Sequence, residues 1–290
     1  MLEHGLTEAA APARTVIVGA GGFVGSAIAR NLEGRGANVL RLGRGDVDLL
    51  ADGAGDRLGA MLTTDDAVVL VSAIAPVKNP TMLRDNVTMI AAMAKAIATA
   101  QPAHVLNIGS DAVFADSPDP LHEGSSRATE NLHGIMHLTR EVALADAYSG
   151  PFATLRPTLI YGADDPHNGY GPNQYRRRAE VGEAIRLFGQ GEERRDHVWV
   201  EDVAELAARM MIHRSIGSLN AVTGQVISFN DLAQIANRLH GPVEIENLPR
   251  SGPMPHGGYR PFDASAITKA FPDMVMTLPE EGLEKVAKGA

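Results

Sequence analysis

The chain has 290 residues, of which 44% are hydrophobic, so it can bury the core of one large domain or of a domain with a smaller lobe. Its 35 acidic residues outnumber its 26 basic ones, and the resulting net charge of -9 argues against a protein that binds nucleic acid through the phosphate backbone. Because it contains no cysteine, disulfide bonds and thiolate metal sites are excluded.

The first residues, MLEHGLTEAAAPAR, carry acidic side chains and no basic stretch that leads into an apolar one, which argues against a signal peptide. Nowhere does an apolar run reach about 18 residues, the length expected of a membrane-spanning helix. We therefore expect an N-terminal extension over residues 1–13, a cytoplasmic location and no membrane partner.

Apolar strands alternate with helices over the next 150 residues or so. The expected strands are TVIVGA, ANVLRLG, AVVLVSAIA, HVLNIGS and FATLRPTLIYG. The expected helices are SAIARNLEGRG, NVTMIAAMAKAIATA and a segment from about 126 to 147. Strands that are apolar throughout and separated by helices indicate a parallel sheet covered on both faces. We predict an α/β protein whose residues 14–162 form a doubly wound, Rossmann-type dinucleotide-binding domain.

Past Gly162 the sequence ADDPHNGYGPNQYRRR is rich in Gly, Pro and Asn, which is typical of a long functional loop. A helix around 178–188, a short HVWV strand and a helix from about 201 to 213 are expected after it. Residues 163–290 are predicted to form mainly a smaller, substrate-binding lobe at the C-terminal end, with a boundary that interleaves with the main sheet.

A glycine-rich turn lies between the first strand and the first helix. The segment VIVGAGGFVGSAIA places Gly19, Gly22 and Gly25 there, with Phe23 and Val24 between the last two. Glycine allows a tight turn and close approach of the backbone to a pyrophosphate, which the helix N-terminus then faces. A turn that only needs positive φ angles is the simpler alternative.

The end of the second strand bears on the choice of cofactor. An NAD-preferring site would offer an acidic residue about 20 residues beyond the glycines, where this chain has Gly43 followed by Arg44. Because an arginine favours a 2'-phosphate, we predict NADP(H) in preference to NAD(H). Asp48 and Leu49 are expected at the adenine edge, although a simple loop aspartate explains Asp48 equally well.

The order of these motifs resembles the extended short-chain dehydrogenase/reductase superfamily, which includes nucleotide-sugar epimerases, dehydratases and reductases. Besides GAGGFVG, the segments VSAIA, NIGSDAVFAD, LRPTLIYG and FGQGEERRDHVWVEDVAE carry the resemblance over nearly the whole chain. It implies that Ser72, Ala73 and Ile74 line the cofactor, together with Pro157. It also implies that Ser110 hydrogen-bonds the substrate oxygen that is oxidised or reduced.

The resemblance breaks at the usual catalytic tyrosine and lysine, which align with His133 and His137. A neutral imidazole can accept a hydroxyl proton and its protonated form can return one, so His133 is a candidate acid/base. Four residues apart on a helix the rings share a face, and His137 is a candidate ligand of the nicotinamide ribose. A catalytically silent pair, or an active Asp111 or Tyr161, remains an alternative. We predict no metal, because no third ligand accompanies the two histidines.

The same resemblance suggests the substrate ligands. Arg195 and Arg260 resemble two arginines that grip the diphosphate of a nucleotide sugar, Asn168 resembles an asparagine that orients the substrate, and Asp111 adjoins Ser110. Arginine suits diphosphate because its planar fork binds two phosphate oxygens at once. The simpler alternative for Arg195 and Arg260 is that they are surface arginines paired with acidic residues. For Asn168 it is an asparagine that forms a turn before a glycine.

We therefore expect an enzyme that transfers a hydride between a sugar carbon of a nucleotide sugar and NADP(H), as an oxidoreductase or epimerase with an atypical active site. The competing hypothesis is a non-catalytic NADP(H) sensor or scaffold on the same fold. The resemblance also suggests a homodimer that pairs through the helices around 86–100 and 126–147.

Overall fold

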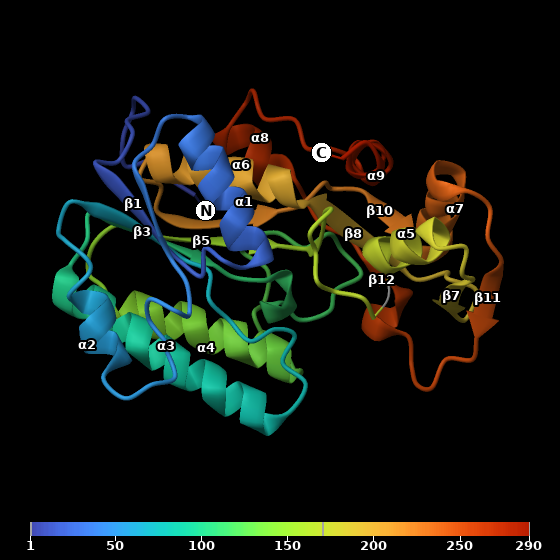
Figure 1. Ribbon diagram of the computed structural model, residues 1–290, viewed down its shortest axis with the longest axis horizontal. Coiled ribbons are helices and arrows are strands. Elements are labelled where there is room, and N and C mark those ends of the chain that lie inside the picture. The colour runs from blue at the N-terminus through green and yellow to red at the C-terminus, as the bar shows by residue number, and fades with distance from the viewer. Residues whose placement is uncertain (1, 170, 290) are drawn as a thin grey trace.

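The computed structural model describes residues 2–169 and 171–289, which form two lobes side by side (Figure 1). The larger lobe is built on a six-stranded sheet in which every neighbouring pair is parallel, in the order β2-β1-β3-β4-β5-β9. Its strands are β1 (Arg14–Val18), β2 (Val39–Leu42), β3 (Asp66–Leu70), β4 (His104–Ile108), β5 (Phe152–Pro157) and β9 (Gly217–Ala221). The predicted doubly wound sheet is confirmed.

Helices cover both faces of this sheet (Figure 1). On one face lie α1 (Phe23–Gly34), α6 (Val200–Ile212) and α8 (Ser265–Ala270), and on the other α2 (Ala54–Gly59), α3 (Pro80–Ala100) and α4 (Leu132–Ala147). Along β1, Ile17 belongs to the first hydrophobic cluster whereas Val16 and Val18 belong to the second. Successive side chains of a strand point to opposite faces, which explains why these strands are apolar throughout.

The smaller lobe contains two small sheets. One has the order β10-β8-β12, with β6 paired to β8 as well, and the other joins β11 to β7. The strands are β6 (Leu159–Tyr161), β7 (Ile185–Phe188), β8 (Arg194–Trp199), β10 (Val226–Ser228), β11 (Ile245–Leu248) and β12 (Tyr259–Arg260). The helices are α5 (Pro172–Glu180), α7 (Phe229–His240) and α9 (Pro279–Ala287), and two short 3-10 turns are η1 (Asp111–Val113) and η2 (Pro255–Gly258).

Two sequence predictions are corrected here. The helix expected around 178–188 is wrong, since α5 ends at Glu180 and residues 185–188 form β7. The strand expected over FATLRPTLIYG is divided, because β5 stays in the large sheet while β6 pairs with β8 in the smaller lobe. The division places Thr158, between the two strands, at the junction of the lobes.

The N-terminal segment lies against the far end of the sheet from the glycine turn. Glu3 forms an antiparallel bridge with Ile216, and the His4 ring stacks on His213 with centroids 4.5 Å apart. His4 also hydrogen-bonds the Ser215 hydroxyl at 2.9 Å. In the described part of the chain, every helix is too short or too polar to cross a membrane.

Candidate active site

The glycine turn forms a cradle at the carboxyl end of β1. Gly19 has a φ of 99°, and a Cβ there would lie 2.7 Å from the backbone nitrogen of Ser72. A Cβ on Gly25 would clash with the carbonyl oxygen of Gly19. Gly22 caps α1 without a side-chain hydrogen bond, and Phe23 and Val24 begin its first turn. This geometry fits a pyrophosphate, because the close backbone approach and the open helix N-terminus both favour an anion.

Beside the cradle is a hollow of about 120 Å³ between the ends of β2 and β3. It is lined by five residues predicted to touch the cofactor, which are Arg44, Asp48, Leu49, Ser72 and Ile74. The Arg44 side chain is 80% exposed and lies 3.3 Å from the Asp48 carboxylate. Asp48 also accepts a hydrogen bond from the Leu50 nitrogen at 3.0 Å, so it helps to shape the loop.

The loop after β3 is held by a residue that sequence reasoning missed. Buried Asn86 on α3 accepts a hydrogen bond from the Ile74 nitrogen and donates one to the Ile74 oxygen, both at 2.9 Å. Ala73 is half-buried next to this pair, and Pro157 is buried at the end of β5. An asparagine in the middle of an amphipathic helix gives no sign of its partner, because that partner is twelve residues away in a loop.

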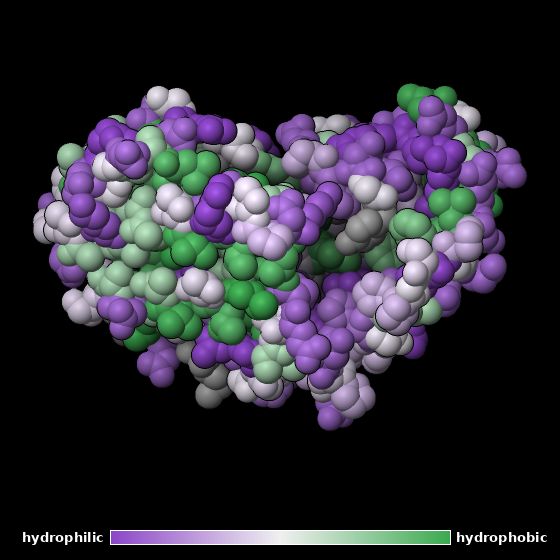
Figure 2. Space-filling model, turned by 90° about the horizontal axis from the view of Figure 1, so that it is seen from below, coloured by the Kyte–Doolittle hydropathy of each residue, from purple (hydrophilic) through white to green (hydrophobic). Residues whose placement is uncertain are grey.

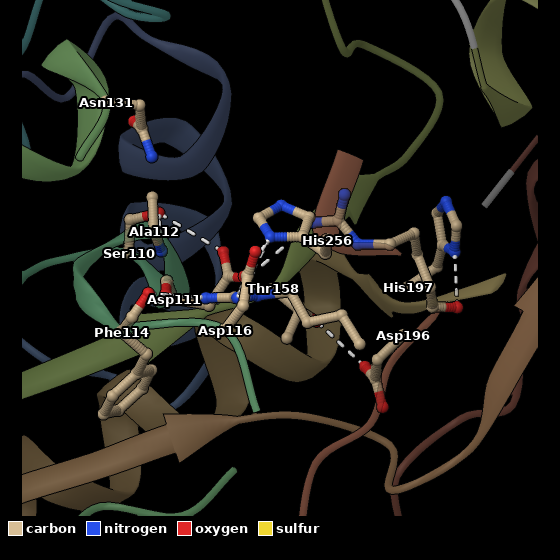
Figure 3. Close-up of polar contacts among 12 residues, drawn as sticks. Ser110, Asp111, Ala112, Phe114, Asp116, Asn131, Thr158, Asp196, His197 and His256 are labelled. Carbon is tan, nitrogen blue, oxygen red and sulfur yellow. Dashed lines mark hydrogen bonds and ion pairs between the residues drawn. The ribbon is translucent and has the colours of Figure 1, made fainter. Parts of the chain in front are cut away.

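Ser110 and Asp111 occupy the turn that follows β4. The Ser110 hydroxyl accepts a hydrogen bond from the Ala112 nitrogen at 3.1 Å and caps η1 (Figure 3). Ser110, Asp111 and His133 line a cavity of about 460 Å³ that lies between the lobes, where Figure 2 shows the surface hollowed. The predicted catalytic serine and histidine are therefore close together.

His133 and His137 lie on one face of α4, with ring centroids 4.7 Å apart and planes at 85°. The Nδ1 atoms of both rings are buried without a hydrogen-bond partner among the described residues. Burial lowers the pKa of His133, while the nearby Asp111 carboxylate acts to raise it. Burial, together with His133 and Arg140, holds the pKa of His137 well below its usual value. His137 is therefore uncharged at neutral pH, and it is not among the residues that line the cavity.

Arginines gather on the smaller-lobe side of the cavity. Arg195 on β8 and Arg250, which sequence reasoning missed, both line it. They lie 3.4 and 3.5 Å from the two carboxylate oxygens of Glu193. The Nε atom of Arg250 is buried without a partner in the described chain. Arg195 also lies 3.9 Å from the Asp111 carboxylate, so two arginines and two carboxylates meet on this wall.

Arg260 lies behind the cavity wall. Its guanidinium donates to the Asp111 carboxylate at 3.1 Å and to the Asp116 carboxylate at 2.6 Å, and also to the carbonyl oxygens of Asp111 and Phe114. Asp116 in turn contacts His256 at 2.5 Å (Figure 3). These bonds orient Asp111 and tie β12 to the turn after β4.

Two other candidates lie elsewhere. Asn168 is exposed and accepts a hydrogen bond from Arg177 at 3.2 Å, apart from the residues that line the cavity. Tyr161 is fully buried, and burial raises the pKa of its hydroxyl. Of the two alternative active residues, Asp111 lines the cavity whereas Tyr161 packs in the core of the smaller lobe. Across residues 2–169 and 171–289, His, Asp and Glu side chains form no cluster of three suited to a metal ion.

Comparisons with known proteins agree with this architecture. A model of the NAD dependent epimerase/dehydratase family matches residues 15–221. The dTDP-4-dehydro-6-deoxy-D-allose reductase of Streptomyces bikiniensis is 27% identical over 283 residues, which cover 83% of this chain and 86% of that protein.

Solved structures share the fold over almost the whole chain. The UDP-glucose 4-epimerase of Thermus thermophilus, solved with NAD, has a TM-score of 0.81 at 20% identity and covers 96% of this chain and 99% of its own. A GDP-L-fucose synthetase from Naegleria fowleri, bound to NADP, has a TM-score of 0.80 at 15% identity, with 97% and 94% covered.

Proposed function

This chain belongs to the NAD dependent epimerase/dehydratase family, and we propose that it is an NADP(H)-dependent enzyme that reduces a carbonyl group on a nucleotide-linked sugar. The observation that carries the proposal is the placement of His133 in one cavity with Ser110 and Asp111. The direction is suggested by the similar reductase of Streptomyces bikiniensis. Relatives of the same fold that were solved with NAD or NADP support a nicotinamide cofactor.

In this proposal the residues have separate roles. Ser110 donates a hydrogen bond to the sugar carbonyl oxygen and polarises it. The protonated His133 gives its proton to that oxygen while the carbonyl carbon accepts a hydride, so the C=O group becomes CH–OH. His137 holds a ribose hydroxyl of the cofactor, for which its buried Nδ1 atom has to become accessible when the cofactor binds. A bound nicotinamide would supply the hydride.

A preference for NADP(H) is supported by the charge at the end of β2. Gly43 has no side chain, and the Asp46 carboxylate nearby accepts a hydrogen bond from its backbone nitrogen at 2.8 Å. The exposed Arg44 guanidinium is available to a 2'-phosphate with only a weak contact to Asp48. A guanidinium binds phosphate oxygens through charge-assisted hydrogen bonds.

The substrate diphosphate is proposed to lie against Arg195 and Arg250, the two cavity arginines. Arg260 is proposed to act on the substrate side by holding Asp111, to which it is already bonded. Asn168 stays a predicted ligand that would have to turn inward from its exposed position. The lack of cysteine suits a reducing compartment, and we place the protein in the cytoplasm.

We also propose that two copies pair through α3 and α4. Val87 on α3 and Ile135 and Val142 on α4 are exposed. Figure 2 shows apolar side chains gathered on the face of the larger lobe where Figure 1 places these helices. An exposed apolar face of this kind marks an interaction surface.

The proposed reaction is tested by following NADPH absorbance with dTDP-, UDP- and GDP-linked keto sugars. We expect one class to oxidise NADPH, and His133→Ala to lower the rate at least about a hundredfold, as removal of a general acid does. His122→Ala is the control, because His122 is exposed and lies outside the cavity. Tight NADPH binding with no oxidation by any sugar would reject the enzymatic proposal and favour a sensor.

A further inference from the structure

Arg140 is a buried cation on the same helix as the two histidines. Its side chain is 1% exposed, and it donates to the Asn107 side-chain oxygen and the Ser72 carbonyl at 2.6 Å each, and to the Leu70 carbonyl at 2.7 Å. All three acceptors are neutral. Among the described residues no carboxylate forms an ion pair with it, although the other buried arginines are paired with acids.

Burial of an unpaired guanidinium lowers the stability of the fold, because a charge removed from water normally needs an opposite charge beside it. Burial lowers the pKa of Arg140 to about 10, so it is still charged at neutral pH. The neighbouring Glu141 gives a direct contrast, because it forms a two-pronged ion pair with Arg156 at 2.7 and 2.8 Å. The sequence therefore places a neutralised charge and an uncompensated one side by side on α4.

The contacts of Arg140 join the catalytic helix to the cofactor cradle. The Ser72 carbonyl oxygen accepts from Arg140, and the Ser72 N–H group donates to the Val18 carbonyl oxygen at 3.0 Å. Ser72 also packs against Gly19. Arg140 is also one helical turn from His137 and acts to lower the pKa of that ring. The guanidinium thus touches the loop that lines the cofactor on one side and acts on the second histidine on the other.

We propose that Arg140 is a positioning residue that fixes α4, and with it His133 and His137, to the loop predicted to line the cofactor. This deepens and rests on the proposed function, because the placement of both rings against a bound cofactor then depends on the bonds of Arg140. The positive charge that a catalytic lysine would contribute at position 137 is present instead one turn further along the helix.

Other charged groups also act on the two histidine rings. On α4, His133 and Arg140 act on His137, and Glu141 is neutralised by Arg156 of β5 and Arg127. From η1, the Asp111 carboxylate acts on His133. Burial opposes protonation of His137 most strongly, followed by His133 and then by Arg140.

The test is a pH titration of the histidine rings by nitrogen NMR on the full chain labelled with ¹⁵N in histidine, with His133→Gln and His137→Gln used for assignment. In the native protein we expect the pKa of His137 to lie below 6.5, chiefly because the ring is buried. In Arg140→Met we expect that pKa to rise, because a positive charge that opposes protonation is gone. Arg140→Lys, which keeps the charge, should behave as the native protein does.

NADPH affinity tests the positioning role separately. Because a lysine ammonium has one nitrogen and cannot span the three acceptors that the planar guanidinium reaches, Arg140→Lys should weaken NADPH binding by about threefold to tenfold while leaving His137 unchanged. Arg127→Met is the control, since it removes an exposed arginine that contacts Glu141, and neither readout should move.

Three results overturn the proposal: a His137 pKa at or above 6.5 in the native protein, no rise of that pKa in Arg140→Met, or native NADPH affinity in Arg140→Lys. If Arg140→Met does not fold, the titration of the native protein and the NADPH affinity of Arg140→Lys still decide whether the proposal holds. Neither readout requires turnover. A failure of the sugar assay with the expected NMR result would therefore count against the proposed function alone.

Discussion

At the level of single residues, the acidity of His133 depends on two opposed influences. Burial disfavours the imidazolium and Asp111 favours it, with burial the stronger. The Asp111 carboxylate is itself fixed by Arg260 at 3.1 Å. The protonation of His133 is thus controlled by a residue from a segment almost 130 positions further along the chain.

This balance predicts how the reaction depends on pH. Reduction needs the protonated His133, so kcat/KM should be high below its pKa and fall as the pH rises through it. Because the pKa is lowered from 6.5, the midpoint should lie below pH 6.5. Asp111→Asn removes the influence that raises the pKa and should move the midpoint lower still. A midpoint at or above 6.5, or one that Asp111→Asn leaves unchanged, would contradict the assignment.

Cofactor choice is also a property of single residues. Arg44→Ala should weaken NADPH binding by about tenfold and leave NADH binding unchanged, since only NADPH has the 2'-phosphate. Arg41→Ala is the matched control, because Arg41 is already held by Glu33 at 2.6 Å. Titration of the protein with each cofactor by fluorescence gives both constants. Equal losses of NADPH and NADH affinity in Arg44→Ala would mean that Arg44 does not read the phosphate.

Residues within local motifs were predictable, whereas those brought in by distant segments were not. Gly19, Gly25 and Ser110 could be named as candidates because each lies in a short pattern next to a strand. Arg140 and Arg250 were missed because nothing in their neighbouring residues shows which oxygens or which cavity they reach. Arg260 was found as a candidate, but its bonds to Asp111 and Asp116 depend on contacts across about 145 residues.

At the level of elements, the junction of β1 and α1 depends on the absence of a side chain at Gly25. A Cβ at Gly25 would clash with the Gly19 carbonyl oxygen, whereas a Cβ at Gly21 would meet nothing within 4 Å. The two glycines are four residues apart in the same turn. Alanine variants at the two positions therefore separate the effect of a steric clash from the effect of the added methyl group alone.

We expect Gly25→Ala to lower the free energy of unfolding by roughly 1 to 3 kcal/mol, as overpacking does, and to weaken NADPH binding at least about tenfold. Gly21→Ala should change neither quantity appreciably. Urea unfolding and cofactor titration of both variants give the comparison. Similar losses in the two variants would show that the turn needs glycine for flexibility rather than for space.

The packing of α4 on β5 relies on the ion pair of Glu141 and Arg156, whose side chains are each 4% exposed. Glu141→Gln leaves the guanidinium buried without a counter-charge, so the free energy of unfolding should fall by roughly 3 kcal/mol or more. Arg127→Ala removes the 46% exposed partner of the same carboxylate and should cost less than about 1 kcal/mol. Urea denaturation measures the free energy of unfolding of both variants. Equal losses in the two would contradict the argument that burial makes the Glu141–Arg156 pair the more important one.

The sequence pattern predicted β1 to β5 and the helices α1, α3, α4 and α6 of the larger lobe, but it missed α2, β9 and α8 and failed between α5 and β7. The segment VGEAIRLF contains good helix formers, yet Gly182 has a φ of 73° and the chain leaves the helix there. Ile185 and Leu187 are then buried and Arg186 and Phe188 exposed, which is a strand pattern too short to stand out. Its partner β11 comes almost 60 residues later.

At the level of the whole molecule, the apolar face of α3 and α4 predicts self-association. Val142→Glu places a charge on that face and should convert a dimer to a monomer in sedimentation experiments at micromolar protein. Val275→Glu is the control, because Val275 is 83% exposed and lies outside both helices. A native protein that is monomeric, or a Val142→Glu variant that still pairs, would exclude this face as the contact.

The path of the described chain has a consequence for protein engineering. It passes between the lobes five times: from β5 to β6, from β8 to α6, from β9 to β10, from β12 to α8 and from α8 to α9. A single cut after residue 162 would leave β9 and α6 on the wrong piece. Exchanging substrate specificity with a relative will therefore require several coordinated grafts, because neither lobe is a transferable module.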